Sequence, residues 1–141
     1  MIKKSITYKD YDGTERVENH YFNLDEAEIM EMELSVDGGF TTMIEKVVSE
    51  QRHPELFKIF KDFVCKSYGE KSADGKYFLK MDEEGRPLYR KFLQTKAYSA
   101  LMTELTHDAK ASAEFVNGIL PVDMAQKYNP GAAITANGTA N

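Results

Sequence analysis

The sequence of 141 residues has little of what enzymes and metal proteins need. It holds one cysteine, Cys65, and no Cys-x-x-Cys pair. An internal disulfide is therefore excluded, and the apolar helical pattern around Cys65 favours a buried thiol over a reactive one. The three histidines lie far apart and none has zinc-motif spacing, so no metal site is expected. Phosphate-binding, dinucleotide-binding and Gly-x-Ser-x-Gly motifs are missing too, which favours a binding protein without a cofactor over an enzyme.

Long apolar runs are also missing. No stretch approaches the roughly 18 apolar residues of a membrane-spanning helix. The two lysines near the start are not followed by an apolar segment, so no signal peptide is expected. The length is that of one domain, and a hydrophobic share of 42% with 29% charged residues is typical of a globular protein. The sequence predicts a cytosolic protein that does not associate with membranes.

Charge is unevenly distributed along the chain. The net charge of −5 argues against a general nucleic-acid-binding protein. Residues 1–51 hold 12 acidic and 5 basic groups, whereas residues 52–96 hold 7 acidic and 11 basic groups. Two interpretations stay open. The segments can form two solvated faces that neutralise each other in the fold, or they can be complementary ends for head-to-tail self-association.

The N-terminal third predicts a hairpin and a helix. Residues 4–22 contain two β-prone runs around an Asp-Gly dipeptide, which is a hairpin turn signal. Asn23 then fits an N-cap with an acidic residue, Glu26, three positions on. The helix predicted over residues 24–35 carries apolar residues three or four positions apart, along one face.

Further helices are predicted downstream. A capping box at Thr42 starts one, and residues 54–68 form the clearest amphipathic pattern in the chain. Residues 70–86 form a polar connection with the short piece Tyr77-Phe78-Leu79, and three more helices are expected after it, with starts at Pro87, Thr95 and Asp108.

These elements together predict an α+β fold that is mostly α. A β-hairpin at residues 4–22 would be followed by a compact bundle of about five or six helices at residues 23–121, in a single domain of residues 1–121. Residues 130–141 carry no charge and almost no large apolar group, so they cannot offset their ordering entropy. Residues 122–141 are therefore expected to form a flexible C-terminal tail.

The helix at residues 24–35 offers candidate contacts. Its methionines Met30 and Met32 suit an adaptable binding surface, although methionines also fill cores. Its carboxylates Glu28 and Glu31 lie three positions apart. Such a pair could bind a cation, act as acid and base, contact the basic helices of a partner, or form a solvated acidic face. Several lysines on the helix at residues 54–68 could contact phosphates, but interleaved acidic residues favour a solvated face.

Four stretches resemble one known family. They are YFNLDEAEIMEME at residues 21–33, IFKDF at 59–63, FLQTKAYS at 92–99 and AEFVNGILP at 113–121. The sequence over about residues 20–121 resembles the tail assembly chaperones of long-tailed, double-stranded-DNA bacteriophages. Two other segments, DGGF at residues 37–40 and KSYGEKSADGKYF at residues 66–78, carry the same resemblance.

The resemblance implies a non-enzymatic protein of the infected host's cytoplasm. Such chaperones bind the tape-measure protein, keep it soluble, help the tail-tube protein polymerise around it, and leave before the tail is finished. In many such phages a ribosomal frameshift yields a longer form. A homo-oligomer is expected, with no nucleic acid or membrane partner. The alternative is a structural virion subunit, part of the tail or associated with the capsid.

The partner groove is expected between the helices at residues 24–35 and 54–68. Both helices are amphipathic, and an apolar groove suits the helices of a long, aggregation-prone partner. The predicted partner-binding residues are Leu24, Glu28, Met30, Glu31, Met32, Leu34, Lys58 and Lys61.

Overall fold

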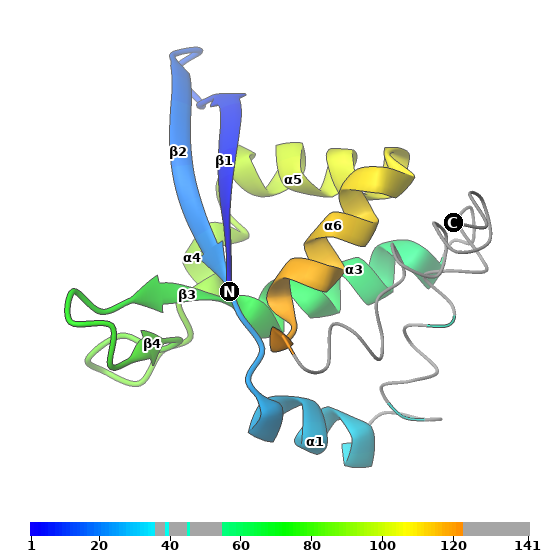
Figure 1. Cartoon of the computed structure of the whole chain (residues 1–141). Coiled ribbons are helices and arrows are strands. Elements are labelled where there is room, and N and C mark those ends of the chain that lie inside the picture. Colours follow the sequence, from blue (N-terminus) through cyan, green and yellow to red (C-terminus); the bar gives the residue numbers. More distant parts are fainter. Residues whose placement is uncertain (36–38, 40–44, 46–54, 123–141) are drawn as a thin grey trace.

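The computed structural model describes residues 1–35, 39, 45 and 55–122. Within them a four-stranded antiparallel sheet packs with five helices (Figure 1). The strands, hydrogen-bonded in this order, are β1 (Ile2–Lys9), β2 (Glu15–Phe22), β3 (Tyr68–Lys71) and β4 (Phe78–Leu79). The helices are α1 (Glu26–Ser35), α3 (Glu55–Ser67), α4 (Tyr89–Phe92), α5 (Lys96–His107) and α6 (Ala109–Ile119).

The predicted N-terminal hairpin is confirmed. Strands β1 and β2 pair along their full lengths, from Ile2 opposite Phe22 to Lys9 opposite Glu15. At the turn the Asp10 amide donates to the Thr14 carbonyl at 2.9 Å. Gly13 adopts a φ of 82°, in the left-handed region that favours glycine and explains the Asp-Gly signal.

The predicted fold class is wrong beyond the hairpin, because the chain is not a mostly helical bundle of five or six helices. Strand β3 extends the sheet by pairing Tyr68 with Phe22 and Gly69 with Tyr21, and β4 pairs with β3. Both strands fall where a helix end and a polar connection were predicted. They have four and two residues, too few for an alternating pattern. Pairing with β2 makes β3 a strand, and pairing with β3 makes β4 one.

Three of the predicted helices agree closely with the structure. Helix α3 matches the amphipathic segment, and α5 and α6 begin after the predicted caps. The Thr95 hydroxyl accepts from the Tyr98 amide, and the Asp108 carboxylate accepts from the Ala111 amide. Helix α4 has only four residues, because the chain turns into the Thr95 cap. The helix predicted from Thr42 lies outside the described residues, apart from the isolated position 45.

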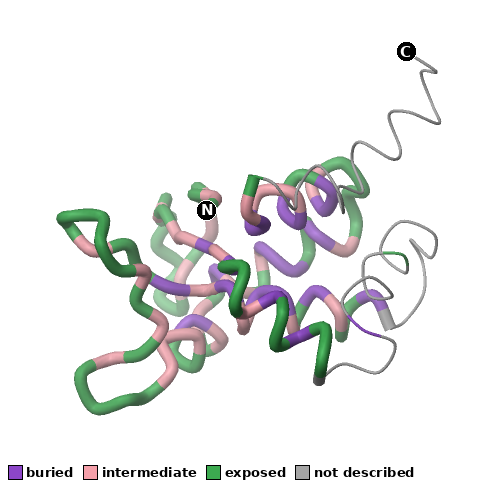
Figure 2. The backbone as a smooth tube through the Cα atoms, turned by 60° about the horizontal axis from the view of Figure 1, so that its bottom comes forward, coloured by how far each residue is buried: buried purple, intermediate pink, exposed green. Residues whose placement is uncertain are grey.

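The core lies where the helices cover the base of the hairpin. Helices α5 and α6 pack on β1, and α3 packs on α5. Figure 2 shows buried positions in the helices and exposed positions in the turns. Phe22 is fully buried, and its ring centroid lies 5.2 Å from that of Phe115 and 5.5 Å from that of Tyr68. The aromatic cluster thereby joins the end of β2 to β3 and α6.

Helix α6 continues through Gly118 to Ile119. A Cβ atom at Gly118 would lie 2.6 Å from the Cδ1 atom of Ile2. The glycine therefore allows the start of β1 to cross α6 at close range. Residues 123–141 lie outside the described part of the chain. The single domain over residues 1–121 and the flexible tail over residues 122–141 stay predictions.

Candidate functional site

Helix α1 follows β2 directly, and backbone hydrogen bonds hold the connection. The Asn23 amide donates to the Ser67 carbonyl at the end of α3, and the Leu24 amide donates to the Ile119 carbonyl at the end of α6. Both distances are 2.8 Å. The side chain of Leu24 is fully buried. These contacts fix the origin of α1 on two helix ends whose carbonyls would otherwise lack helical partners.

The N-cap of α1 lies two residues later than predicted. The Ile29 amide donates to the Asp25 carbonyl at 3.0 Å, as expected for a helix capped at Asp25. The carboxylate of Glu28 accepts from the Asp25 amide at 3.0 Å, which is one half of a capping box. Asn23 instead donates from its side-chain amide to the Asp25 carboxylate at 2.7 Å. The prediction of Asn23 as the cap with Glu26 at the third helical position is wrong.

A pocket of about 270 Å³ lies beside the inner side of α1. Its lining residues are Leu24, Glu28, Glu31, Met32 and Lys66. Four of the eight predicted partner-binding residues are thus brought together, joined by a lysine from the end of α3. Leu24 and Met32 line the pocket although both are almost fully buried, and the other three residues supply charge of both signs.

The four apolar candidates, three on α1 and Leu24 just before it, differ in exposure. Leu24 and Met32 belong to the core, with 0% and 4% of their surface exposed. Met30 and Leu34 are 63% and 89% exposed. These two lie four residues apart and share one helical face. Glu33, an exposed residue, is next to Leu34 in the sequence. A partner that approaches α1 from outside meets an apolar pair beside acidic groups.

The two basic candidates lie on α3. Lys58 and Lys61 are both exposed, and Phe57, next to Lys58, is 46% exposed. Neither lysine lines the pocket beside α1, which takes Lys66 from the same helix instead. Lys66 also forms an ion pair with Asp62 at 3.0 Å.

The described face of α1 therefore combines exposed apolar side chains, carboxylates and a small pocket. A family model for phage tail assembly chaperones matches residues 1–138. The chain belongs to the phage tail assembly chaperone family. This membership confirms the resemblance seen over about residues 20–121, and the match also includes the hairpin and most of the C-terminal tail. No curated protein and no solved structure matches the chain.

Chaperones of this family are generally non-enzymatic. Among the residues that the structure describes, no group of three or more His, Cys, Asp or Glu side chains is placed to hold a metal ion. In the same ranges, no helix is both long enough and apolar enough to cross a membrane.

Lys80 positions α1 in this chaperone, a role that the sequence did not predict. Its Nζ atom donates to the carbonyls of Asn23 and Lys66, each at 2.7 Å, and to the Glu28 carboxylate at 2.5 Å. One side chain from the end of β4 thus connects the start of α1, the pocket wall and the end of α3. Nothing in the sequence distinguishes Lys80 from the ten other basic residues between positions 52 and 96. Its role depends on β3 and β4, which were not predicted as strands.

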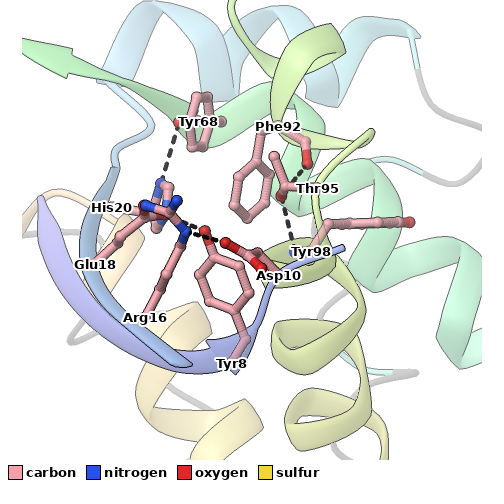
Figure 3. A network of polar contacts seen from close by, with 9 residues as sticks. All are labelled: Tyr8, Asp10, Arg16, Glu18, His20, Tyr68, Phe92, Thr95 and Tyr98. Carbon is pink, nitrogen blue, oxygen red and sulfur yellow. Dashed lines mark hydrogen bonds and ion pairs between the residues drawn. The ribbon is translucent and has the colours of Figure 1, made fainter. Parts of the chain in front are cut away.

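A second polar cluster of the chaperone joins the hairpin to β3 (Figure 3). His20 Nδ1 lies 3.2 Å from the hydroxyl of Tyr68, and the Tyr8 hydroxyl donates to Glu18 at 2.6 Å. His20 Nε2 lies 3.5 Å from the Glu18 carboxylate without the geometry of a hydrogen bond. The His20 ring also packs on Phe92, with centroids 4.9 Å apart.

Burial determines the protonation of this cluster. Desolvation lowers the pKa of His20 below its usual 6.5, more strongly than the nearby Glu18 carboxylate raises it. Desolvation also raises the pKa of Tyr68 to about 12. Both side chains are therefore mainly neutral at pH 7, so the contact between His20 of the hairpin and Tyr68 of β3 joins two neutral groups.

The turn carboxylate of Asp10 predicts a loss of stability in acid. The Arg16 guanidinium, 2.6 Å away, and the Thr14 amide hold the pKa of Asp10 below its usual 3.8. A carboxylate with a lowered pKa in the folded state stabilises the fold above pH 3.8, and this contribution is lost as the pH falls through the folded pKa. Asp10→Asn is expected to be less stable than wild type at pH 6, with a difference that shrinks below pH 3.8.

Thermal midpoints of both proteins from pH 6 to pH 2.5 measure that difference. Asp12→Asn is the control, because no ion pair of Asp12 is found within the described ranges. A difference between wild type and Asp10→Asn that stays constant over the whole pH range would contradict the prediction.

Proposed function

We propose that this chaperone binds the phage tape-measure protein through the exposed face of α1, keeps that protein soluble, and assists tail-tube polymerisation around it. The observation that carries the proposal is the pair Met30 and Leu34, exposed by 63% and 89% on a helix rich in carboxylates. Family membership supports a role in tail assembly. A long amphipathic partner needs its apolar stripes covered before assembly, and an exposed apolar pair can cover them.

The acidic surroundings of this pair indicate the preferred partner segment. Helix α1 contains four glutamates and no basic residue. A partner helix with apolar residues at intervals of three or four, flanked by Lys or Arg, would match both its apolar and its charged groups. The pocket lined by Glu28 and Glu31 can receive one side chain of such a helix, with Lys66 setting its orientation.

Co-expression with the tape-measure protein of the same phage tests the α1 surface. The double variant Met30→Glu, Leu34→Glu is expected to reduce the soluble tape-measure protein about tenfold or more, because each substitution places a charge at an apolar contact. The variant itself should fold normally, since both side chains are exposed. Met32 is 4% exposed and would be unsuitable, because a glutamate there would disturb the core.

Met81→Glu serves as the matched control. Met81 is 59% exposed, close to the value for Met30, and it lies on the β4 side of the molecule. The control should keep the tape-measure protein soluble. If the double variant and the control behave alike, α1 is not the contact surface. If neither wild type nor variants keep the partner soluble, the proposed chaperone activity of this form is wrong.

The remaining parts of the proposal concern assembly. We infer that the chaperone acts in the cytoplasm of the infected host, as a homo-oligomer that contacts the tail-tube protein and a longer frameshifted form of itself. Many weak sites along one tape-measure chain would gain affinity through avidity. The chaperone should be missing from mature virions. Mass spectrometry of purified particles tests this, since a structural subunit would be retained.

A further inference from the structure

The outer edge of β1 forms a surface separate from α1. Strand β1 lies at the end of the sheet order and pairs only with β2. In an antiparallel pair, residues alternate between those whose backbone groups bond to the partner strand and those whose groups point away. Because Asp10 pairs with Thr14 by a backbone hydrogen bond, the even-numbered residues of β1 bond to β2. The odd-numbered residues therefore direct their amides and carbonyls outward.

Four consecutive outward positions are available on this edge: Lys3, Ser5, Thr7 and Lys9. All four are exposed, and no backbone hydrogen bond from them to another element is found in the described part of the chain. Such a row of unpaired amides and carbonyls is the template that an added strand recognises.

A groove of about 230 Å³ runs beside this edge. Its lining residues are Lys4, Ser5, Ile6 and Thr7 from β1 and Ala100, Leu101 and Glu104 from α5. The ammonium of Lys4 forms an ion pair with the Glu104 carboxylate across it. A strand edge beside a helix wall is the arrangement in which several peptide-binding domains take up an extended segment.

The charge of β1 indicates which kind of segment can bind along its edge. The strand carries three lysines and no acidic residue. Two copies meeting edge to edge at β1 would place like charges together, which disfavours that pairing. A segment with carboxylates on alternate residues would instead match Lys3 and Lys9. On the α5 side the groove is lined by the partly buried Ala100, which suits apolar side chains on the other alternate positions.

We propose that β1 accepts an extended acidic segment of a partner protein as a fifth strand, seated in the groove between β1 and α5. This binding does not depend on the proposed role of α1, since the two surfaces share no residue. The hairpin supplies backbone hydrogen bonds, and the lysines make the edge selective for negative charge.

Labelled peptides test the proposal with the full chain. The probe is a six-residue peptide of alternating Glu and Val with an N-terminal fluorophore, followed by fluorescence anisotropy. A second probe carries N-methyl groups on the backbone amides that would bond to β1, and a third replaces Glu with Lys. The Glu-Val peptide is expected to bind, and the two others should bind about tenfold more weakly or not at all. No binding, or equal binding of the N-methylated peptide, overturns the proposal.

Protein variants locate the binding edge. Ser5→Pro removes an outward amide without removing a bond to β2, so binding should fall about tenfold or more. Ser5→Ala keeps the amide and should bind as wild type does. Thr7→Pro is the second variant if Ser5→Pro fails to fold, and Lys3→Glu with Lys9→Glu should reverse the preference toward the Lys-Val peptide.

Hydrogen exchange gives a readout independent of affinity. The amides of Ser5 and Thr7 should exchange rapidly in the free chain and slow at least about tenfold with bound peptide. Protection confined to other elements would overturn the proposal. The double variant Met30→Glu, Leu34→Glu should bind the peptide as wild type does, so failure of the α1 proposal and failure of this one are distinguishable.

Discussion

Replacing Phe22 with alanine is expected to lower the free energy of unfolding by about 3–5 kcal/mol, a typical loss for a fully buried aromatic side chain. Phe22 has no exposed surface and contacts the rings of Tyr68, Phe92 and Phe115. It ends β2 at the point where β3 joins the sheet. The substitution therefore leaves a cavity where hairpin, sheet extension and helices meet.

Urea denaturation followed by circular dichroism measures this loss. Val17→Ala is the matched control, because Val17 lies on the same strand and is 65% exposed. That substitution should change the free energy of unfolding by less than about 0.5 kcal/mol. Similar losses for the two variants would contradict the central packing role of Phe22.

Replacing Lys80 with methionine is expected to lower the free energy of unfolding by about 2–3 kcal/mol. The substitution keeps most of the side-chain volume but removes the ammonium group. The Glu28 carboxylate loses its ion pair, and the Asn23 and Lys66 carbonyls each lose a hydrogen bond from a charged donor. The ammonium is partly shielded from solvent, which makes these bonds stronger than exposed ones.

The larger consequence concerns α1, which should open more readily when Lys80 is removed. Hydrogen exchange of residues 26–35 is expected to accelerate more than that of α5, and binding of the tape-measure protein should weaken. Lys76→Met is the control, since Lys76 is an exposed lysine of the same β-hairpin. Equal exchange rates in the two variants would show that Lys80 does not hold α1.

Local signals were sufficient for a large part of the fold. The Asp-Gly dipeptide located the first hairpin, because a left-handed residue at Gly13 suits its turn. The caps at Thr95 and Asp108 located two helix starts, because each side chain satisfies a free amide nearby in the sequence. At α1 the predicted N-cap, Asn23, lies two residues before the observed one. Both Asn23 and Asp25 have side chains that can cap a helix, and the chain uses Asp25.

Short strands and long-range contacts could not be predicted from local sequence signals. The turn at Asp82–Gly85 repeats the pattern of the first hairpin, with the Asp82 carboxylate accepting from the Glu84 and Arg86 amides. This pattern could have marked residues 70–86 as further hairpins. The choice between Met30 and Met32 had no such signal, since both are methionines on one helix, and only the position of α1 relative to the core separates them.

The sequence by itself determined the first hairpin, three amphipathic helices and the resemblance to tail assembly chaperones. These properties depend on neighbouring residues or on residue type. Tertiary structure decided the four-stranded sheet, the hydrogen bonds of Lys80 to α1 and α3, the exposure of Met30 and Leu34, and the open edge of β1. Each of these depends on which segment lies beside another distant in sequence, because burial and strand pairing are completed only when the chain has folded.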